Sequence, residues 1–211
     1  MSDALARAER VAREEWGFPH LKDGQARAIR AVTQGKDCFV GLATGHGKSL
    51  CYQILPSIAD EPTMVVVISP LQALVADQIR RYQQVTGYTA VHLSSIDAIT
   101  AFAANPDPRA RLVFMAPEEA TSTAGRRFIM NTPIKLGLVA VDEAHCIPEW
   151  GKDFRIPFSR IGTLRAAIPD VPFMALTATA TEAVKTAVKE GLHLTGTEVM
   201  GDLNRSNIVI V

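Results

Sequence analysis

The 211-residue sequence has few cysteines, no long apolar run and no excess of charge of either sign. Its three cysteines, Cys38, Cys51 and Cys146, form no CxxC pair, so we expect neither a zinc site nor a disulfide framework. No apolar run approaches the roughly 18 residues of a membrane span, and the N-terminus lacks the apolar segment of a secretory signal. These absences predict an intracellular protein without membrane contact, whose thiols stay reduced.

The overall charge is balanced, with 22 basic and 22 acidic residues. Apolar residues make up 47% and charged residues 21%, which is typical of a globular domain and excludes a disordered chain. A chain of this length is expected to fold as about one domain without a metal or disulfide. The zero net charge argues against a nucleic-acid partner only if the charge is spread evenly. The segment from Trp150 to Arg165, however, contains four basic residues and only one acidic residue.

Short β-branched segments alternate with longer helical patterns along the chain, which predicts an open, mostly parallel α/β sheet with helices on both faces. The expected strands are 37–43, 63–69, 89–94, 111–116, 137–142, 172–177 and, at the end, 207–211. The expected helices are 3–15, 24–33, 48–59, 71–85, 97–104, 118–130, 158–168 and 180–192. Ligands of such sheets bind where the strands end, so the residues after each strand are the candidates for a site.

The first expected strand leads into a glycine-rich loop and then a helix, with the sequence Leu42-Ala43-Thr44-Gly45-His46-Gly47-Lys48-Ser49. This is the G-x-G-K-[ST] core of a phosphate-binding loop in the required strand–loop–helix context. Backbone N–H groups and the helix N-terminus can hold an anion, Lys48 can reach the β- and γ-phosphates, and Ser49 can bind Mg²⁺. The strict pattern has glycine where this chain has Leu42.

Two further strand ends carry polar residues suited to nucleotide chemistry. Asp142 and Glu143 follow one apolar strand: Asp142 can bind Mg²⁺, and Glu143 can orient and deprotonate the water that attacks the γ-phosphate. A helix cap is the simpler interpretation of Asp142, but it does not account for the second acid. Thr177 and Thr179 follow another strand, where they could contact phosphate or the acidic pair, or simply cap the next helix.

Together these motifs resemble the nucleotide core of superfamily 2 helicases, in which the acidic motif here has the form Asp-Glu-Ala-His. The segment 144–155, AHCIPEWGKDFR, resembles the aromatic-rich loop of RecQ-type DNA helicases. Segments 69–78 and 116–118 resemble two further motifs of that family, and 16–25 resembles its adenine-reading element. The resemblance covers about residues 16–180. It implies a RecA-like P-loop domain that uses ATP and Mg²⁺ to unwind DNA in the 3′-to-5′ direction.

The resemblance also implies roles for particular residues. Phe18 would stack on adenine, while Lys22 and Gln25 would hydrogen-bond it. His145 would couple the γ-phosphate to Thr177 and Thr179. Three residues of the loop would contact single-stranded DNA and signal its arrival to the ATP site, namely Trp150, Phe154 and Arg155.

The sequence departs from the family pattern in several places. Ala43 and His46 replace the more usual proline and glycine, and His46 would be strained if the tight loop gave it a positive φ. Leu21 replaces an aromatic residue, which affects only local packing. Pro148 and Glu149 stand where small or polar residues are usual.

The family motor has two RecA-like lobes, and this chain carries the motifs of the first alone. We therefore expect residues 1–202 to form the ATP-binding lobe and 203–211 to begin a linker, with weak ATPase in the absence of the second lobe. A stand-alone module that binds nucleotide or DNA without turnover, and a small-molecule P-loop kinase, are the alternatives. An RNA helicase is a variant disfavoured by the loop at 144–155. The location would be nuclear in a eukaryote, and cytoplasmic or nucleoid-associated in a bacterium.

Overall fold

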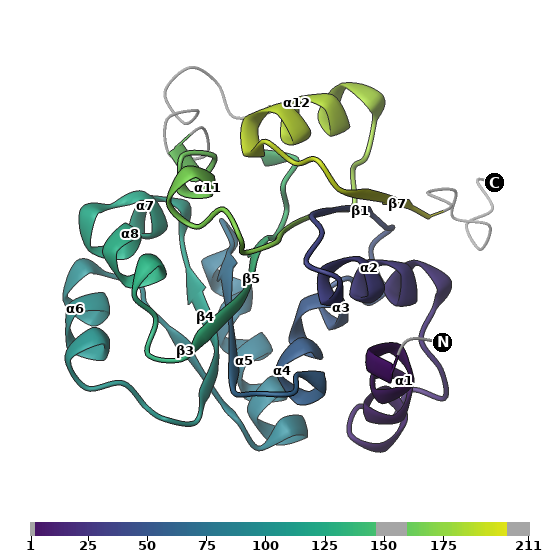
Figure 1. Cartoon of the computed structure of the whole chain (residues 1–211), viewed down its shortest axis with the longest axis horizontal. Helices are drawn as coiled ribbons and strands as arrows, with labels where there is room; N and C mark the ends of the chain where they lie inside the picture. The colour runs from purple at the N-terminus through teal and green to yellow at the C-terminus, as the bar shows by residue number, and fades with distance from the viewer. Residues whose placement is uncertain (1–2, 147–159, 202–211) are drawn as a thin grey trace.

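The computed structural model describes residues 3–146 and 160–201, and it contains a single seven-stranded sheet in which every pair of neighbours is parallel. The strand order is β3-β4-β2-β5-β6-β1-β7 (Figure 1). The strands are β1 (Cys38–Gly41), β2 (Thr63–Ile68), β3 (Thr89–His92), β4 (Ala110–Met115), β5 (Lys135–Val141), β6 (Phe173–Thr177) and β7 (Thr197–Met200). The predicted parallel α/β class is confirmed.

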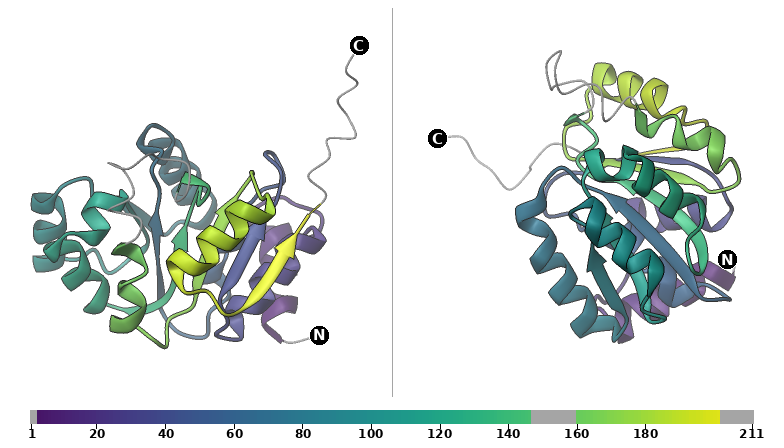
Figure 2. Two further views of the ribbon diagram at one scale, coloured as in Figure 1. Left: turned by 90° about the horizontal axis from the view of Figure 1, so that it is seen from above. Right: turned by 90° about the vertical axis from the view of Figure 1, so that its left-hand side faces the viewer.

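Helices cover both faces of the sheet (Figure 2). One face packs on α1 (Asp3–Glu14), α2 (Asp23–Thr33), α3 (Leu50–Gln53), α4 (Leu55–Ile58) and α5 (Gln72–Thr86). The other packs on α6 (Ile96–Ala104), α7 (Pro117–Thr121), α8 (Thr123–Met130), α11 (Leu164–Ala167) and α12 (Glu182–Leu192). Central strands are therefore buried on both sides, and this is why β2 is apolar at five consecutive positions. No helix in the described part of the chain is long and apolar enough to cross a membrane.

Six strands lie where the sequence predicts them, but β7 was missed. It is a short edge strand in which only Val199 is buried, so it has no apolar run that a sequence pattern could reveal. The strand expected at 207–211 and the linker expected at 203–211 lie outside the described residues. The boundary of the lobe therefore stays a prediction.

Two predicted helices are each divided in the structure. The pattern at 48–59 forms α3 and α4, with Pro56 in the first turn of α4. The pattern at 118–130 forms α7 and α8, because the Ser122 side chain accepts the Gly125 N–H and caps a new helix. A Cβ atom at Gly125 would lie 1.9 Å from the Glu119 carbonyl oxygen, so the tight junction requires glycine. In the described part of the pattern at 158–168, residues 160–161 are helical and α11 spans Leu164–Ala167.

At the end of the sheet where the strands begin, a buried aspartate holds several segments together. Asp37, 7% exposed, directly precedes β1 and accepts hydrogen bonds from the backbone N–H of Phe173 (2.9 Å) and Thr195 (3.2 Å). It also pairs with the guanidinium of Arg165, which lies 4.3 Å from the centre of the Phe173 ring. One side chain thus ties β1, β6, α11 and the segment before β7 together.

The strand order brings the candidate motifs together. The P-loop follows β1, the acidic motif follows β5 and the threonine motif follows β6. These three strands are neighbours in the order β5-β6-β1. Because parallel strands end at the same edge of a sheet, the three motifs lie side by side.

Candidate functional site

A cleft of about 570 Å³ opens at this edge of the sheet. Its lining comes from the P-loop, from the acidic motif, from α5 and from the segment before α2. Among the side chains and loop residues that line the cleft are Phe18, Lys22, Gln25, Gly45, His46, Gly47, Lys48, Ser49, Leu71, Leu74, Gln78, Arg81, Asp142 and Glu143. The structure therefore gathers the predicted adenine and magnesium residues around one cavity, together with the predicted phosphate residues except Thr44, which is exposed and does not line it.

The tight turns of the P-loop fall on its glycines. Gly45 and Gly47 adopt φ values of +82° and +72°, where residues with a Cβ atom are strained. His46 between them does not have a positive φ, so the strain expected there is absent. Its N–H donates to the Ala43 carbonyl (3.1 Å), forming a β-turn that a non-glycine residue can adopt.

Leu42 occupies the position where the strict P-loop pattern has glycine, and its side chain is buried, 4% exposed. It packs against Gly24 of α2, where an added Cβ would lie 2.8 Å from a Leu42 methyl group. The larger residue is thus accommodated because the facing helix has no side chain at that point.

Lys48 and Ser49 lie at the start of the helix that follows the loop. The Lys48 ammonium donates to the Leu42 carbonyl (3.2 Å), which holds it over the loop. The Ser49 hydroxyl makes no capping hydrogen bond to its own helix and lines the cleft. Both groups are therefore placed where a bound phosphate and its metal would need them.

Gln25 is buried and links the adenine element to the P-loop. Its amide nitrogen donates to the carbonyls of His46 (3.2 Å) and Gly47 (3.0 Å). Its oxygen accepts the Lys22 N–H (2.9 Å). Both amide hydrogens are thus engaged within the protein, and one lone pair of the oxygen is left for a ligand. Phe18 is half-buried beside it, with its ring packed against the core and lining the cleft.

Asp142 and Glu143 lie at the end of β5, facing Lys48 across the cleft. Burial, and secondarily the neighbouring Glu143 carboxylate, raise the pKa of Asp142 from its ordinary 3.8 to about 6. The Glu143 N–H, which donates to Asp142 Oδ1 (3.0 Å), and the Lys48 charge act in the opposite direction. Because its surroundings stabilise the negative charge of this carboxylate poorly, a cation bound beside it would be favourable.

Glu143 has a φ of +49°, a left-handed conformation that costs a residue with a side chain about 1–3 kcal/mol. The N–H of the next residue, Ala144, donates a hydrogen bond to the Leu176 carbonyl of β6 (2.8 Å). This turn directs the Glu143 side chain toward His145, whose Nδ1 lies 3.3 Å from Glu143 Oε2. The strain lies at Glu143, the predicted general base, and not at His46.

The histidine of the acidic motif lies in contact with the threonine motif. His145 Nδ1 lies 3.2 Å from the Thr177 hydroxyl. That hydroxyl donates to the Thr179 carbonyl and accepts the Thr179 N–H, each at 3.0 Å. Since its only proton goes to Thr179, Thr177 accepts from His145, which then carries a proton on Nδ1. A chain of polar contacts thus runs from Glu143 through His145 to the end of β6.

The donor set fits magnesium. Hydroxyl and carboxylate oxygens are the ligands that Mg²⁺ prefers, and Ser49 and Asp142 offer one of each in the same cleft. Within the described ranges, no three His, Cys, Asp or Glu side chains group closely enough to hold a metal alone. Such sparse ligation is typical of Mg²⁺ that is completed by phosphate oxygens and water.

The three residues expected to contact DNA, Trp150, Phe154 and Arg155, lie outside the described residues. The basic excess expected around them is smaller than the sequence suggests. Arg165 is paired with the buried Asp37 and stacked on Phe173, so its charge is committed to the fold.

The structure adds cleft residues to which the sequence analysis gave no role. Gln78 and Arg81 on α5 also line the cleft, together with the exposed Leu71 and Leu74. Their spacing of three or four residues, 71-74-78-81, puts them on one face of the helix. That spacing was a signal available in the sequence. Tyr52, fully buried behind the P-loop, had no comparable signal.

Comparisons with known proteins identify relatives of the chain. Residues 22–187 match the family model described as DEAD/DEAH box helicase. The chain is 37% identical over 198 residues to the ATP-dependent DNA helicase RecQ of Pasteurella multocida (strain Pm70), covering 92% of this chain and 30% of that protein. It is 34% identical over 210 residues to the RecQ-like DNA helicase BLM of Xenopus laevis, covering 94% and 15%. The chain thus spans less than a third of the length of these curated relatives.

Solved structures show the same fold. The crystal structure of the helicase MrfA bound to DNA has a TM-score of 0.75 at 20% identity, covering 96% of this chain and 30% of that one. A hypothetical ATP-dependent RNA helicase from Sulfolobus tokodaii has a TM-score of 0.62 at 20% identity, covering 95% and 57%. With its family match extending over most of the sequence and with RecQ proteins among its relatives, the chain belongs to the DEAD/DEAH box helicases.

Proposed function

We propose that this chain is the ATP-binding lobe of a RecQ-like DNA helicase. Joined to a second RecA-like lobe, it couples the hydrolysis of Mg-ATP to 3′-to-5′ translocation and unwinding of DNA. The observation that carries the proposal is the convergence of Lys48, Asp142 and Glu143 on one cleft, with Gln25 and Phe18 at its adjoining end.

The adenine end of the cleft favours ATP over GTP. Phe18 offers a ring face for the base. Because both amide hydrogens of Gln25 are engaged by the P-loop, its side chain can only accept from a base. The exocyclic amine of adenine supplies the donor, whereas the corresponding carbonyl of guanine does not. Gln25 thus selects adenine while it holds the P-loop in place.

At the phosphate end, Lys48 would neutralise the β- and γ-phosphates. Ser49 and Asp142 would hold a magnesium ion, which would supply positive charge to the phosphoryl group. Glu143 orients the attacking water and takes its proton. His145 links Glu143, which follows β5, to Thr177 at the end of β6, and this contact is the proposed route by which a change at the γ-phosphate reaches the neighbouring strand. Trp150, Phe154 and Arg155 are the proposed contacts to single-stranded DNA.

The direct test is binding of ATP and GTP to this chain by calorimetry, together with ATP hydrolysis with and without single-stranded DNA. We expect Mg-ATP binding that Lys48→Ala abolishes, weaker GTP binding and slow turnover. The same assay on a version extended by the second lobe is expected to show DNA-stimulated turnover. Failure of ATP to bind would refute the proposal, and binding without turnover in the extended protein would instead favour a module that only binds nucleotide.

A further inference from the structure

The segment that connects α1 to α2, residues 15–22, carries one end of the cleft lining. Phe18 and Lys22 lie on this connecting segment and line the cleft, as do Pro19 and His20 between them. The segment contains no helix or strand. Its position therefore depends on the hydrogen bonds that its backbone makes with neighbouring elements.

Two backbone N–H groups of the connecting segment donate to α1. The Phe18 N–H donates to the Ala12 carbonyl in the last turn of that helix (2.9 Å). The Leu21 N–H donates to the side chain of Glu9, with 3.1 Å between the nitrogen and Oε2. The first contact uses a carbonyl that any residue at position 12 would provide. The second depends on the side chain of Glu9, so a single substitution can remove it.

The helix that carries Glu9 is itself held in place. Its buried face packs against α2 and α4 (Figure 1). On the same helix, the Arg7 guanidinium donates to the Ile58 carbonyl of α4 (3.0 Å) and pairs with Asp60 (3.0 Å). Glu9 therefore ties the connecting segment to a helix that is anchored in the core.

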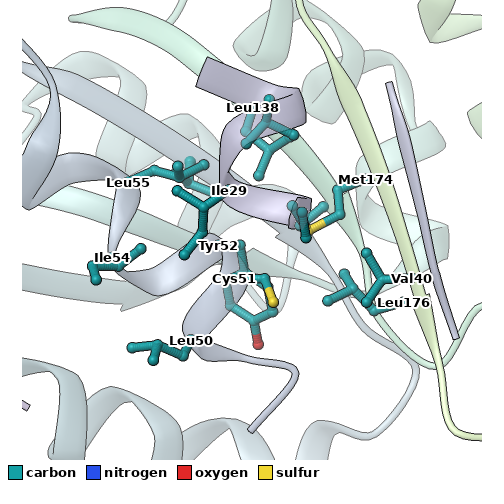
Figure 3. Packing of buried hydrophobic residues seen from close by; sticks show 14 of the residues in the cluster. Ile29, Val40, Leu50, Cys51, Tyr52, Ile54, Leu55, Leu138, Met174 and Leu176 are labelled. Carbon is teal, nitrogen blue, oxygen red and sulfur yellow. The ribbon is translucent and has the colours of Figure 1, made fainter. Parts of the chain in front are cut away.

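Leu21 is the point at which the connecting segment enters the core. Its side chain is 6% exposed and belongs to the apolar cluster on this face of the sheet, part of which Figure 3 shows. The next residue, Lys22, donates its N–H to the Gln25 side chain (2.9 Å). Of the three backbone contacts at Phe18, Leu21 and Lys22, only that of Leu21 has a carboxylate as its acceptor. Hydrogen bonds to charged groups are stronger than those between neutral groups.

We propose that Glu9 is a positioning residue, which holds the connecting segment against α1 and thereby sets how Phe18 and Lys22 face the adenine base. The inference rests on the proposed function, because it assumes that this end of the cleft receives adenine. Glu9 acts through the Leu21 backbone and does not touch the nucleotide. It adds a determinant of ATP affinity on α1, outside the segment 16–25 that carries the adenine motif.

The test compares the binding of ATP with that of inorganic triphosphate, which has neither base nor sugar, by calorimetry in excess Mg²⁺. The dissociation constant of triphosphate divided by that of ATP measures what the base end of the cleft contributes. Glu9→Ala leaves the Leu21 N–H without its acceptor, while the contacts of Phe18 and Lys22 remain. We expect ATP affinity to fall about three- to tenfold and triphosphate affinity to stay unchanged, so the ratio falls by the same factor.

Two further variants separate positioning from a general loss of stability. Glu9→Gln keeps an oxygen that can accept the Leu21 N–H, so it should retain most of the wild-type ratio. Glu14→Ala is the matched control, because it removes an exposed carboxylate from the end of the same helix and should leave the ratio unchanged. A general weakening of the fold would lower both affinities together and would not move the ratio.

The outcomes distinguish this inference from the proposed function. An unchanged ratio in Glu9→Ala, an equal fall in Glu14→Ala, or no recovery in Glu9→Gln would overturn the role of Glu9. If the wild-type chain bound neither ATP nor triphosphate, the proposed function would fail as well. If the wild-type chain preferred ATP and kept that preference in Glu9→Ala, this inference alone would be rejected.

Discussion

The buried carboxylate of Asp142 is expected to lower the free energy of unfolding at neutral pH. Its pKa rises from 3.8 to about 6 on folding, so the folded chain holds a proton more tightly than the unfolded chain does. The contribution of the protonated carboxyl to stability is complete below about pH 3.8 and is lost as the pH rises through about 6. Since one pKa unit corresponds to about 1.4 kcal/mol, the cost approaches about 3 kcal/mol at neutral pH.

Asp142→Asn removes the charge and keeps an oxygen that can accept the Glu143 N–H. We expect the variant to have a higher free energy of unfolding than the wild type, by about 1 kcal/mol near pH 4.5 and about 3 kcal/mol near pH 7.5. Urea denaturation in EDTA at the two pH values measures both differences. Asp77→Asn, in which the replaced side chain is 73% exposed, is the control and should change stability little. A difference independent of pH, or a variant less stable at neutral pH, would show that the carboxylate is not strained by its surroundings.

Three further changes test other parts of the structure. Asp37→Ala leaves the guanidinium of Arg165 without its buried partner and should lower the free energy of unfolding by about 3–5 kcal/mol in chemical denaturation; a loss below about 1 kcal/mol would mean that the pair contributes little. Gln25→Ala should lower the melting temperature even without nucleotide, because the carbonyl of Gly47 loses its donor, and should reduce the preference for ATP over GTP in calorimetry; an unchanged preference would remove Gln25 from base selection. Trp150→Ala should leave ATP binding intact and weaken the stimulation of ATPase by single-stranded DNA in the two-lobe protein, whereas equal loss of both would assign Trp150 a structural role.

Sequence patterns predicted the central part of the fold because those strands are buried on both faces. β2 and β4 read as nearly continuous apolar runs. The same reasoning could not find β7, because an edge strand with one buried residue has no such run. Nor could it divide 118–130 into two helices, since the division depends on the cap at Ser122 and on the close contact at Gly125.

The candidate site was predictable as far as its residues follow strands. Lys48, Asp142 and Thr177 each come directly after a strand or loop with a recognisable pattern, and the sheet brings them together. The location of strain was not predictable. The loop sequence predicted strain at His46, but the residue with a left-handed conformation is Glu143. The residue after it, Ala144, is hydrogen-bonded to the neighbouring strand β6. Contacts between distant segments decide such details.

The contact between Leu42 and Gly24 has an evolutionary consequence. The two residues are 18 positions apart, and a Cβ atom added at Gly24 would lie 2.8 Å from a Leu42 methyl group, which would have to shift. In homologues where glycine occupies the first P-loop position, the facing point on α2 is free to accept a larger residue. The two positions should therefore vary together in an alignment, with larger residues at position 24 accompanying smaller residues at position 42.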